Sequence, residues 1–232
     1  MNKEIIIGFL NEYDINCTHC SVSNFIKTDA SCALCKSMNR DISLLITNIH
    51  GARRTVDVGL ALPPSAELTP YEPYKSAGFE VFVQEGKTET ERIKSIFNAT
   101  IRKGYETVIV LSSNVPNLPL SYIEYALYDL RNGNNLVLGP SENGMFYLIG
   151  IKRMLYDKII NDDIFSTISF DNSTLRDSTL KMMQEHCNDC SILPNWYILK
   201  SMDDLKKLYK DYLHGIGWKA QWTHLIAHNL LG

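Results

Sequence analysis

The sequence lacks the features of a membrane protein and of a nucleic-acid-binding protein. Its net charge is −3 at pH 7 and it has no extended run of lysine or arginine, so nothing attracts it to a phosphate backbone. The longest apolar run near the N-terminus, residues 5–10, is too short for a signal-peptide core or a membrane span. We therefore expect a cytoplasmic protein, with neither nucleic acid nor membrane as its partner.

The sequence also lacks internal repeats and low-complexity linkers. Of its 232 residues, 45% are hydrophobic and 21% are charged, which is typical of a soluble globular protein. This length suits one α/β domain, or one domain with a small appendage. We expect a single domain over residues 1–232.

Cysteine is grouped rather than scattered. The six cysteines form three Cys-x-x-Cys pairs, namely Cys17/Cys20, Cys32/Cys35 and Cys187/Cys190. In a cytoplasmic protein such pairs indicate metal or redox chemistry rather than a disulfide scaffold. The first two pairs can place four thiolates around one tetrahedral Zn²⁺, which would order a polar loop, so we predict a structural zinc site. An iron–sulfur cluster uses the same ligands, and free or redox-active thiols are the other alternative.

The apolar patterns alternate between strand-like and helix-like segments. Strands are expected at residues 4–10, 56–62, 79–83, 108–111, 136–138 and 146–151. Helices are expected at residues 41–49, 71–77, 89–103, 122–131, 179–185, 203–213 and 218–231. Residues 11–40 are polar, cysteine-rich and poorly periodic, and we interpret them as an inserted loop. This alternation predicts an α/β fold with a mainly parallel sheet and helices on both faces.

Two of the expected helices have a clear apolar face. In residues 89–103 that face consists of Ile93, Ile96, Phe97, Thr100 and Ile101. In residues 218–231 the side chains expected to pack are Trp222, Leu225, Ile226 and Leu230.

Residues 107–151 contain two motifs that resemble a known family. They read Ser-Asn-Val-Pro-Asn-Leu-Pro from Ser113, and Leu-Gly-Pro-Ser-Glu-Asn-Gly-Met-Phe-Tyr-Leu-Ile-Gly from Leu138. These are similar to the G-[ST]-D-x-P-D-L-P and L-G-P-x-x-D-G-G-[YF]-Y-L-I-G patterns of a glycosyltransferase-A-like family of small bacterial proteins, often encoded near radical-SAM enzymes. That family is related to nucleotide-sugar transferases and nucleotidyltransferases. The resemblance spans roughly residues 79–210 and weakens outside these motifs.

The resemblance implies a three-layer α/β fold of the nucleotide-diphospho-sugar transferase type. The inserted cysteine-rich segment, residues 11–40, then follows the first strand, where the family has a basic loop. The implied partners are a nucleotide-sugar and a small-molecule or peptide acceptor. A protein partner is a further possibility.

The chain departs from the family at its acidic positions. The family's Asp residues are replaced by Asn114, Asn117 and Asn143, and Lys200 falls at a position of its closing D-[IV]-D motif. Mg²⁺ or Mn²⁺ prefers anionic oxygen ligands, so these replacements leave it open whether either ion binds. As an alternative, the three asparagines are turn residues, because asparagine suits turns.

The remaining candidate residues surround the same implied site. Lys200 would neutralise phosphate in place of a metal, unless it is a solvated lysine before a helix. Asn114, Asn117, Asn143, Gly144 and Arg53 would bind the nucleotide. Glu142 would be the acid–base group, unless it is a surface loop residue. Met145, which stands where the family has glycine, would crowd the nucleotide or the acceptor.

These residues support three hypotheses. The first is a glycosyltransferase that uses a nucleotide-sugar without a tightly held metal. The second is a catalytically inactive relative that serves as a binding or assembly subunit, stabilised by the four-cysteine metal site. The third is a nucleotidyltransferase, which the absence of the basic loop disfavours because a triphosphate needs more positive charge.

Overall fold

The computed structural model describes residues 3–12, 22, 24–26, 28–52, 55–142, 145–159 and 189–231. At its centre is a seven-stranded sheet with the strand order β3-β2-β1-β4-β6-β5-β7. The strands are β1 (Glu4–Phe9), β2 (Asp57–Leu62), β3 (Glu80–Val83), β4 (Thr107–Ser112), β5 (Leu136–Pro140), β6 (Phe146–Lys152) and β7 (Cys190–Ile192). The strands expected from the sequence are all present, and β7 is an addition.

The sheet is mostly parallel, with one reversed strand. β1 pairs in parallel with β2 and β4, β2 with β3, and β5 with β7, whereas β6 is antiparallel to both β4 and β5. The reversal follows from the short connection between β5 and β6, because a tight turn can join only antiparallel strands. The carboxyl ends of β1 to β5 therefore lie along one edge of the sheet.

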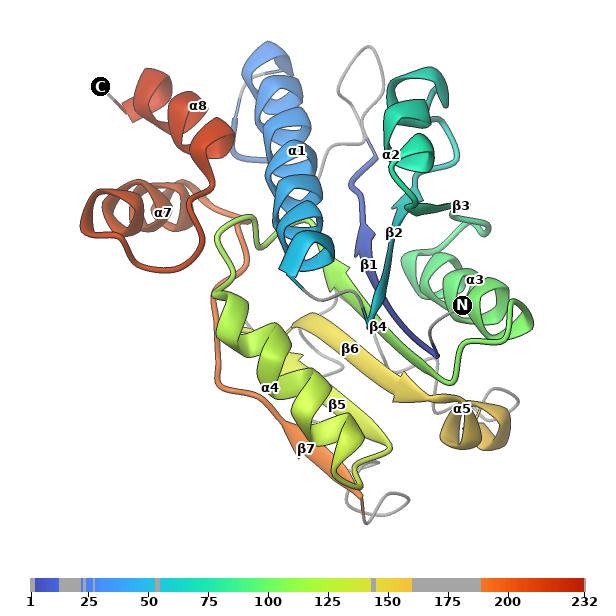
Figure 1. Cartoon of the computed structure of the whole chain (residues 1–232). Coiled ribbons are helices and arrows are strands. Elements are labelled where there is room, and N and C mark those ends of the chain that lie inside the picture. The colour runs from blue at the N-terminus through green and yellow to red at the C-terminus, as the bar shows by residue number, and fades with distance from the viewer. Residues whose placement is uncertain are drawn as a thin grey trace.

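Helices cover both faces of the sheet, which gives the three predicted layers (Figure 1). One face packs against α1 (Thr28–Ala52) and α4 (Leu120–Arg131), with the short helices η1 (Thr69–Tyr71) and α2 (Glu72–Ser76) at its margin. The other face packs against α3 (Glu89–Arg102) and α5 (Arg153–Ile159). Adjacent residues of β1 alternate accordingly, with Ile6 in the first core and Ile5 and Ile7 in the second.

Helix α3 agrees with its predicted pattern residue by residue. Its buried side chains are the expected Ile93, Ile96, Phe97, Thr100 and Ile101. A capping box begins the helix: the Thr88 side chain accepts from the Glu91 backbone N–H, and the Glu91 carboxylate accepts from the Thr88 backbone N–H.

Helix α1 corrects the interpretation of residues 11–40 as a loop. It runs from Thr28 to Ala52, so the predicted short helix at 41–49 is only its second half. The buried Leu34, Cys35 and Met38 continue its apolar stripe into the first half. Treating the cysteines only as metal ligands hid this stripe, because a buried cysteine packs as a small apolar side chain.

The C-terminal helices α7 (Met202–His214) and α8 (Gln221–Leu231) form a hairpin beside α1 (Figure 1). Within α8, Thr223 and Ala227 are fully buried, whereas Leu225 is 49% exposed and Leu230 is 36% exposed. The predicted packing of these two leucines is therefore wrong. The described helices include none that is long and apolar enough to cross a membrane.

Candidate functional site

The edge where β1 and β4 end side by side is the natural position for a ligand. Phe9 pairs with Ser112 in this parallel register, and the Ser113 backbone N–H donates to the Phe9 carbonyl at 3.1 Å. Open α/β sheets bind ligands beyond the carboxyl ends of their strands. The residues that follow, Asn11 and Asn114, lie at this edge.

Asn11 is held by a buried side chain from α1. The Asn39 carboxamide accepts from the Asn11 backbone N–H at 2.8 Å and donates to the Asn11 carbonyl at 3.0 Å. Asn11 N–H also donates to the Ser113 hydroxyl at 3.0 Å. The Asn39 carboxamide thus bonds to both main-chain groups of Asn11 beside the end of β1. Sequence reasoning missed both asparagines, since Asn39 lay in the supposed loop.

Asn114 is buried, at 3% exposed, and joins this network. Its Oδ1 accepts from Asn11 Nδ2 at 2.7 Å, and its backbone carbonyl accepts from the Leu199 N–H at 2.9 Å. The second contact brings the segment before α7 against the end of β4. Two predicted site residues that are far apart in the sequence, Asn114 and Lys200, are thereby brought together.

Lys200 is half-buried directly before α7. Its backbone N–H donates to the Asp204 carboxylate at 3.1 Å, and the same carboxylate accepts from the Ser201 hydroxyl at 2.7 Å. Burial lowers the pKa of the Lys200 ammonium, and the Glu89 carboxylate at the start of α3 opposes this shift.

Asn117 belongs to a separate, structural hydrogen-bond chain. Its Nδ2 donates to the Tyr197 hydroxyl, and its Oδ1 accepts from Trp196 Nε1 at 3.3 Å. The Tyr197 hydroxyl in turn donates to the buried Asp211 carboxylate at 2.8 Å, and burial raises the pKa of Tyr197. Both ends of the Asn117 carboxamide are used within the protein, so this geometry gives it a role in packing.

Glu142 lies on the exposed loop after β5. Its carboxylate forms an ion pair with Lys207 at 2.9 Å, and Lys207 lies 4.4 Å from the centre of the Tyr197 ring. Among the described residues, no hydrogen bond or ion pair joins Glu142 to Asn114 or Lys200. The predicted Asn143, Gly144 and Arg53 lie outside the described residues.

We predicted that Met145 would crowd a ligand, but its side chain lies in the core. It is 4% exposed and packs in the core under α1 and α4. Its backbone is fixed by Ser141, whose hydroxyl accepts from the Met145 N–H at 3.0 Å. This corrects the prediction that a bulky residue here obstructs a ligand.

The described residues do not fit a tightly held Mg²⁺ or Mn²⁺. They include no group of three or more His, Cys, Asp or Glu side chains that could hold a metal. At the two described replaced positions, the oxygens of Asn114 and Asn117 accept hydrogen bonds from within the protein. A hard cation needs anionic oxygen ligands, and neither Asn114 nor Asn117 supplies one.

Cys32 and Cys35, on the first half of α1, are both disulfide-bonded. Zinc binds the thiolate form, so the described half of the predicted four-cysteine site does not support zinc. Cys17 and Cys20 lie outside the described residues. Cys190 is also disulfide-bonded, and Cys187 lies outside the described residues.

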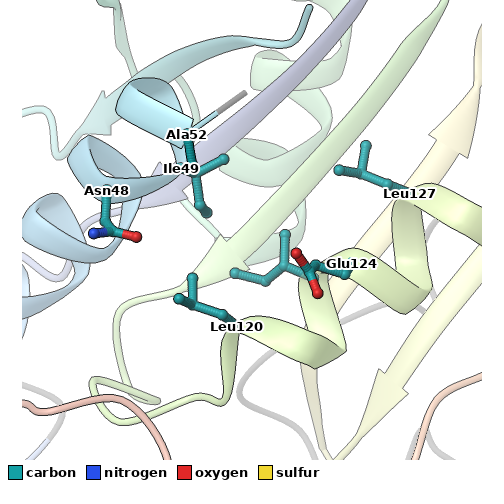
Figure 2. Close-up of a pocket in the computed structure, with 7 residues that line it drawn as sticks. Asn48, Ile49, Ala52, Leu120, Glu124 and Leu127 are labelled. Atoms are coloured by element: carbon teal, nitrogen blue, oxygen red, sulfur yellow. The ribbon is translucent and has the colours of Figure 1, made fainter. Parts of the chain in front are cut away.

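A small hollow lies between α1 and α4, on one face of the sheet (Figure 2). Apolar side chains line it, with the polar groups of Asn48 and Glu124 among them. Its volume is about 50 Å³, whereas ligand pockets usually have about 300 to 1,000 Å³. This hollow is therefore too small for a nucleotide.

Comparison with known proteins agrees with this fold. Residues 48–172, more than half of the chain, match the family described as an uncharacterized protein conserved in bacteria, DUF2064. The chain belongs to the DUF2064 family. No curated protein matches it.

Several solved structures are similar to this DUF2064 protein in fold. One is a protein from Desulfovibrio desulfuricans G20, proposed to be a nucleotide-diphospho-sugar transferase; it has 21% identity and a TM-score of 0.75, over 99% of this chain and 95% of the other. The 4-diphosphocytidyl-2C-methyl-D-erythritol synthase of Anaerococcus prevotii DSM 20548 has 9% identity and a TM-score of 0.52, over 99% of each chain. A CMP:2-keto-3-deoxy-manno-octonic acid synthetase complexed with CTP has 9% identity and a TM-score of 0.51, over 93% of this chain and 100% of the other. At these identities the similarity shows the fold alone.

Proposed function

We propose that this DUF2064 protein binds a nucleotide-sugar at the edge formed by β1 and β4 and transfers its sugar without a tightly held divalent cation. The observation that carries the proposal is the half-buried Lys200 beside the buried Asn114. The similarity to a protein proposed to be a nucleotide-diphospho-sugar transferase supports it through the fold.

The chemistry requires positive charge where the diphosphate leaves. A transferase must stabilise negative charge on the departing phosphate, and a metal usually does so. A lysine within about 4 Å of a phosphate oxygen supplies roughly 4 kcal/mol near a protein surface. Lys200 can fill this role because Asp204 fixes its backbone.

Glu142 is the proposed acid–base group, and it must first leave Lys207, with which it forms an exposed ion pair. The acceptor is a small molecule or a peptide with a nucleophilic hydroxyl or amine. A mutation that removes Lys207 should then raise the activity, or leave it unchanged, rather than abolish it.

Thermal shift with nucleoside diphosphates, triphosphates and nucleotide-sugars tests the proposal, each with Mn²⁺ or with EDTA. A ligand that binds the folded state raises Tm by mass action. We expect one nucleotide-sugar to raise Tm equally in both conditions, and Lys200→Gln to weaken its binding at least tenfold. Lys206→Gln is the matched control, because Lys206 is exposed on the helix that follows Lys200 and pairs locally with Asp203. Binding that requires Mn²⁺, or that survives Lys200→Gln, contradicts the metal-free role of Lys200.

A catalytically inactive subunit is the second candidate function. The observation that favours it is Asn117, whose carboxamide is fully used in packing. An assay at saturating nucleotide-sugar distinguishes the two candidate functions. Release of nucleoside diphosphate, by hydrolysis or by transfer, indicates an enzyme. Binding without any release over days indicates the subunit.

A nucleotidyltransferase is the third candidate, and the CTP-bound synthetase shares its fold. A Tm shift with a nucleoside triphosphate, larger than with any diphosphate, would identify it.

A further inference from the structure

Helix α4 carries two exposed tyrosines on its outer face (Figure 1). The side that packs against the sheet consists of Ile123, Ala126, Leu127 and Leu130. On the outer side, Tyr125 is 52% exposed and Tyr128 is 65% exposed. They are three residues apart, so their side chains are neighbours on the helix surface. Tyrosine is enriched where proteins contact one another, and an exposed pair therefore directs attention to this face.

Tyr125 is held in place by its neighbours. Its ring centre lies 6.5 Å from that of Tyr122, and the Tyr122 ring meets the Trp196 ring edge-on at 5.6 Å. A side chain that is already ordered loses little conformational entropy when a partner binds. The outer face of α4 is thus partly organised before any contact forms.

A second, larger hollow lies against this face. Its volume is about 430 Å³, and it is lined by Glu124, Tyr125, Leu127, Tyr128 and Arg131. All five residues belong to α4, so the hollow is a surface groove between the outward side chains of one helix. Grooves of this kind accept the side-chain ridges of another helix.

The charges of the outer face are arranged so that the face is complementary to itself. Glu124, Tyr128 and Arg131 follow one another at i, i+4 and i+7, which places the tyrosine between an acid and a base. The two charged residues are about 10.5 Å apart along the helix axis. A two-fold axis beside Tyr128 reverses the second helix, so that each Glu124 lies opposite the Arg131 of the other copy.

Arg131 has donors left for such a contact. Its Nε donates to the Glu4 carboxylate at 2.9 Å, and one terminal nitrogen, Nη2, bonds to the same carboxylate. The guanidinium has five N–H groups in all, and the side chain is 39% exposed. A second carboxylate can therefore bind Arg131 while Glu4 stays in place.

We propose that the outer face of α4 is a contact between two copies of this chain, with the two helices antiparallel about a two-fold axis beside Tyr128. Tyr125 and Tyr128 supply the apolar area, and two Glu124–Arg131 pairs set the register. A contact made by one helix from each copy belongs to the small interfaces, which are typical of weak association. The dimer therefore dissociates in the micromolar range or above, and it forms independently of the proposed transfer reaction.

Sedimentation equilibrium of the wild-type chain, from micromolar to millimolar concentration, is the first test. We expect a monomer–dimer equilibrium whose Kd rises at least about tenfold in Tyr128→Glu, the effect of roughly 1.4 kcal/mol. Leu225→Glu, at a similarly exposed position on α8, is the matched control and should leave the Kd unchanged. A chain that stays monomeric throughout, as it would if this face bound a different protein, overturns the inference. A dimer that survives Tyr128→Glu, or that is lost in Leu225→Glu, also overturns it.

A charge exchange tests the two-fold arrangement. Glu124→Arg places two arginines opposite each other, and Arg131→Glu places two glutamates opposite each other, so each variant should associate with itself at least about tenfold more weakly. In a mixture of the two variants, every reversed charge faces its opposite, and association should return. A mixture that associates no better than its components overturns the inference.

Two controls separate this result from other effects of the substitutions. Glu67→Arg makes the same change of charge at an exposed position outside α4 and should not alter association. Glu4→Gln weakens the pairing with Arg131 within one copy without reversing a charge on α4. It should leave the dimer intact, and loss of the dimer in Glu4→Gln overturns the assignment of Arg131 to the contact.

Discussion

Individual side chains at the end of β1 determine the shape of the candidate site. Asn39 bonds to both main-chain groups of Asn11 and so joins α1 to the end of β1. The contacts join residues 28 positions apart, so no local pattern of the sequence could reveal them. The predicted replacement of acidic residues by Asn114 and Asn117, by contrast, rests on motif letters alone and stays a prediction.

Asn39→Ala should lower the free energy of unfolding by about 1 to 3 kcal/mol, because it removes two partly buried hydrogen bonds to the Asn11 main chain. Urea denaturation measures this change. Asn48→Ala, at an exposed position on the same helix, is the control and should change stability by less than about 0.5 kcal/mol. A loss in Asn39→Ala no larger than in the control would show that Asn11 finds other partners.

At the scale of elements, most helices and strands follow from their periodicity. The apolar face of α3 repeats every three or four residues and is closed by Thr88 and Glu91, so both its face and its start were predictable. The direction of β6 was not, because periodicity shows whether a strand is buried and not which way it runs. Helix α1 was predictable only in part, since its first half carries Cys32 and Cys35 in a polar context.

Thr88→Ala should destabilise the protein by about 1 kcal/mol, the usual effect of losing an N-cap side chain. Differential scanning calorimetry of Thr88→Ala, with Thr90→Ala as a control inside the same helix, measures it. Thr88→Ser retains the hydroxyl and should restore most of the loss. If Thr88→Ser is as unstable as Thr88→Ala, the cap is not the cause.

At the scale of the whole molecule, α1 connects the C-terminal hairpin to the sheet. Asp41 of α1 caps α8: its carboxylate accepts from the Thr223 N–H and hydroxyl, each at 2.7 Å, and from the Trp222 N–H at 3.3 Å. The neighbouring Arg40 guanidinium lies 3.5 Å from the centre of the Trp222 ring. The hairpin is therefore attached through two adjacent residues of one helix.

This attachment should depend on pH. Burial raises the pKa of Asp41 from 3.8 to about 6, although the Thr223 hydrogen bonds act in the opposite direction. The folded state then binds the proton more tightly than the unfolded state, so the contribution of Asp41 to stability falls as pH rises from about 4 to about 6. The change amounts to roughly 3 kcal/mol.

Asp41→Asn removes this titration while keeping an acceptor for the Thr223 N–H. The stability of Asp41→Asn relative to the wild type should be about 2 to 3 kcal/mol greater at pH 7.5 than at pH 4. Urea denaturation at both values measures the difference. Asp203→Asn, at an exposed position, is the control. A difference that is the same at both pH values would show that Asp41 titrates normally.

Asn39 and Asp41 are two residues apart on α1, and one holds the end of β1 while the other holds α8. Helix α1 therefore contacts both the candidate ligand edge and the C-terminal helix. We expect a ligand that immobilises Asn11 to slow amide hydrogen exchange in α8, and by reciprocity a protein without residues 221–232 to bind that ligand more weakly. The C-terminal helix would then contribute to affinity from the far side of α1.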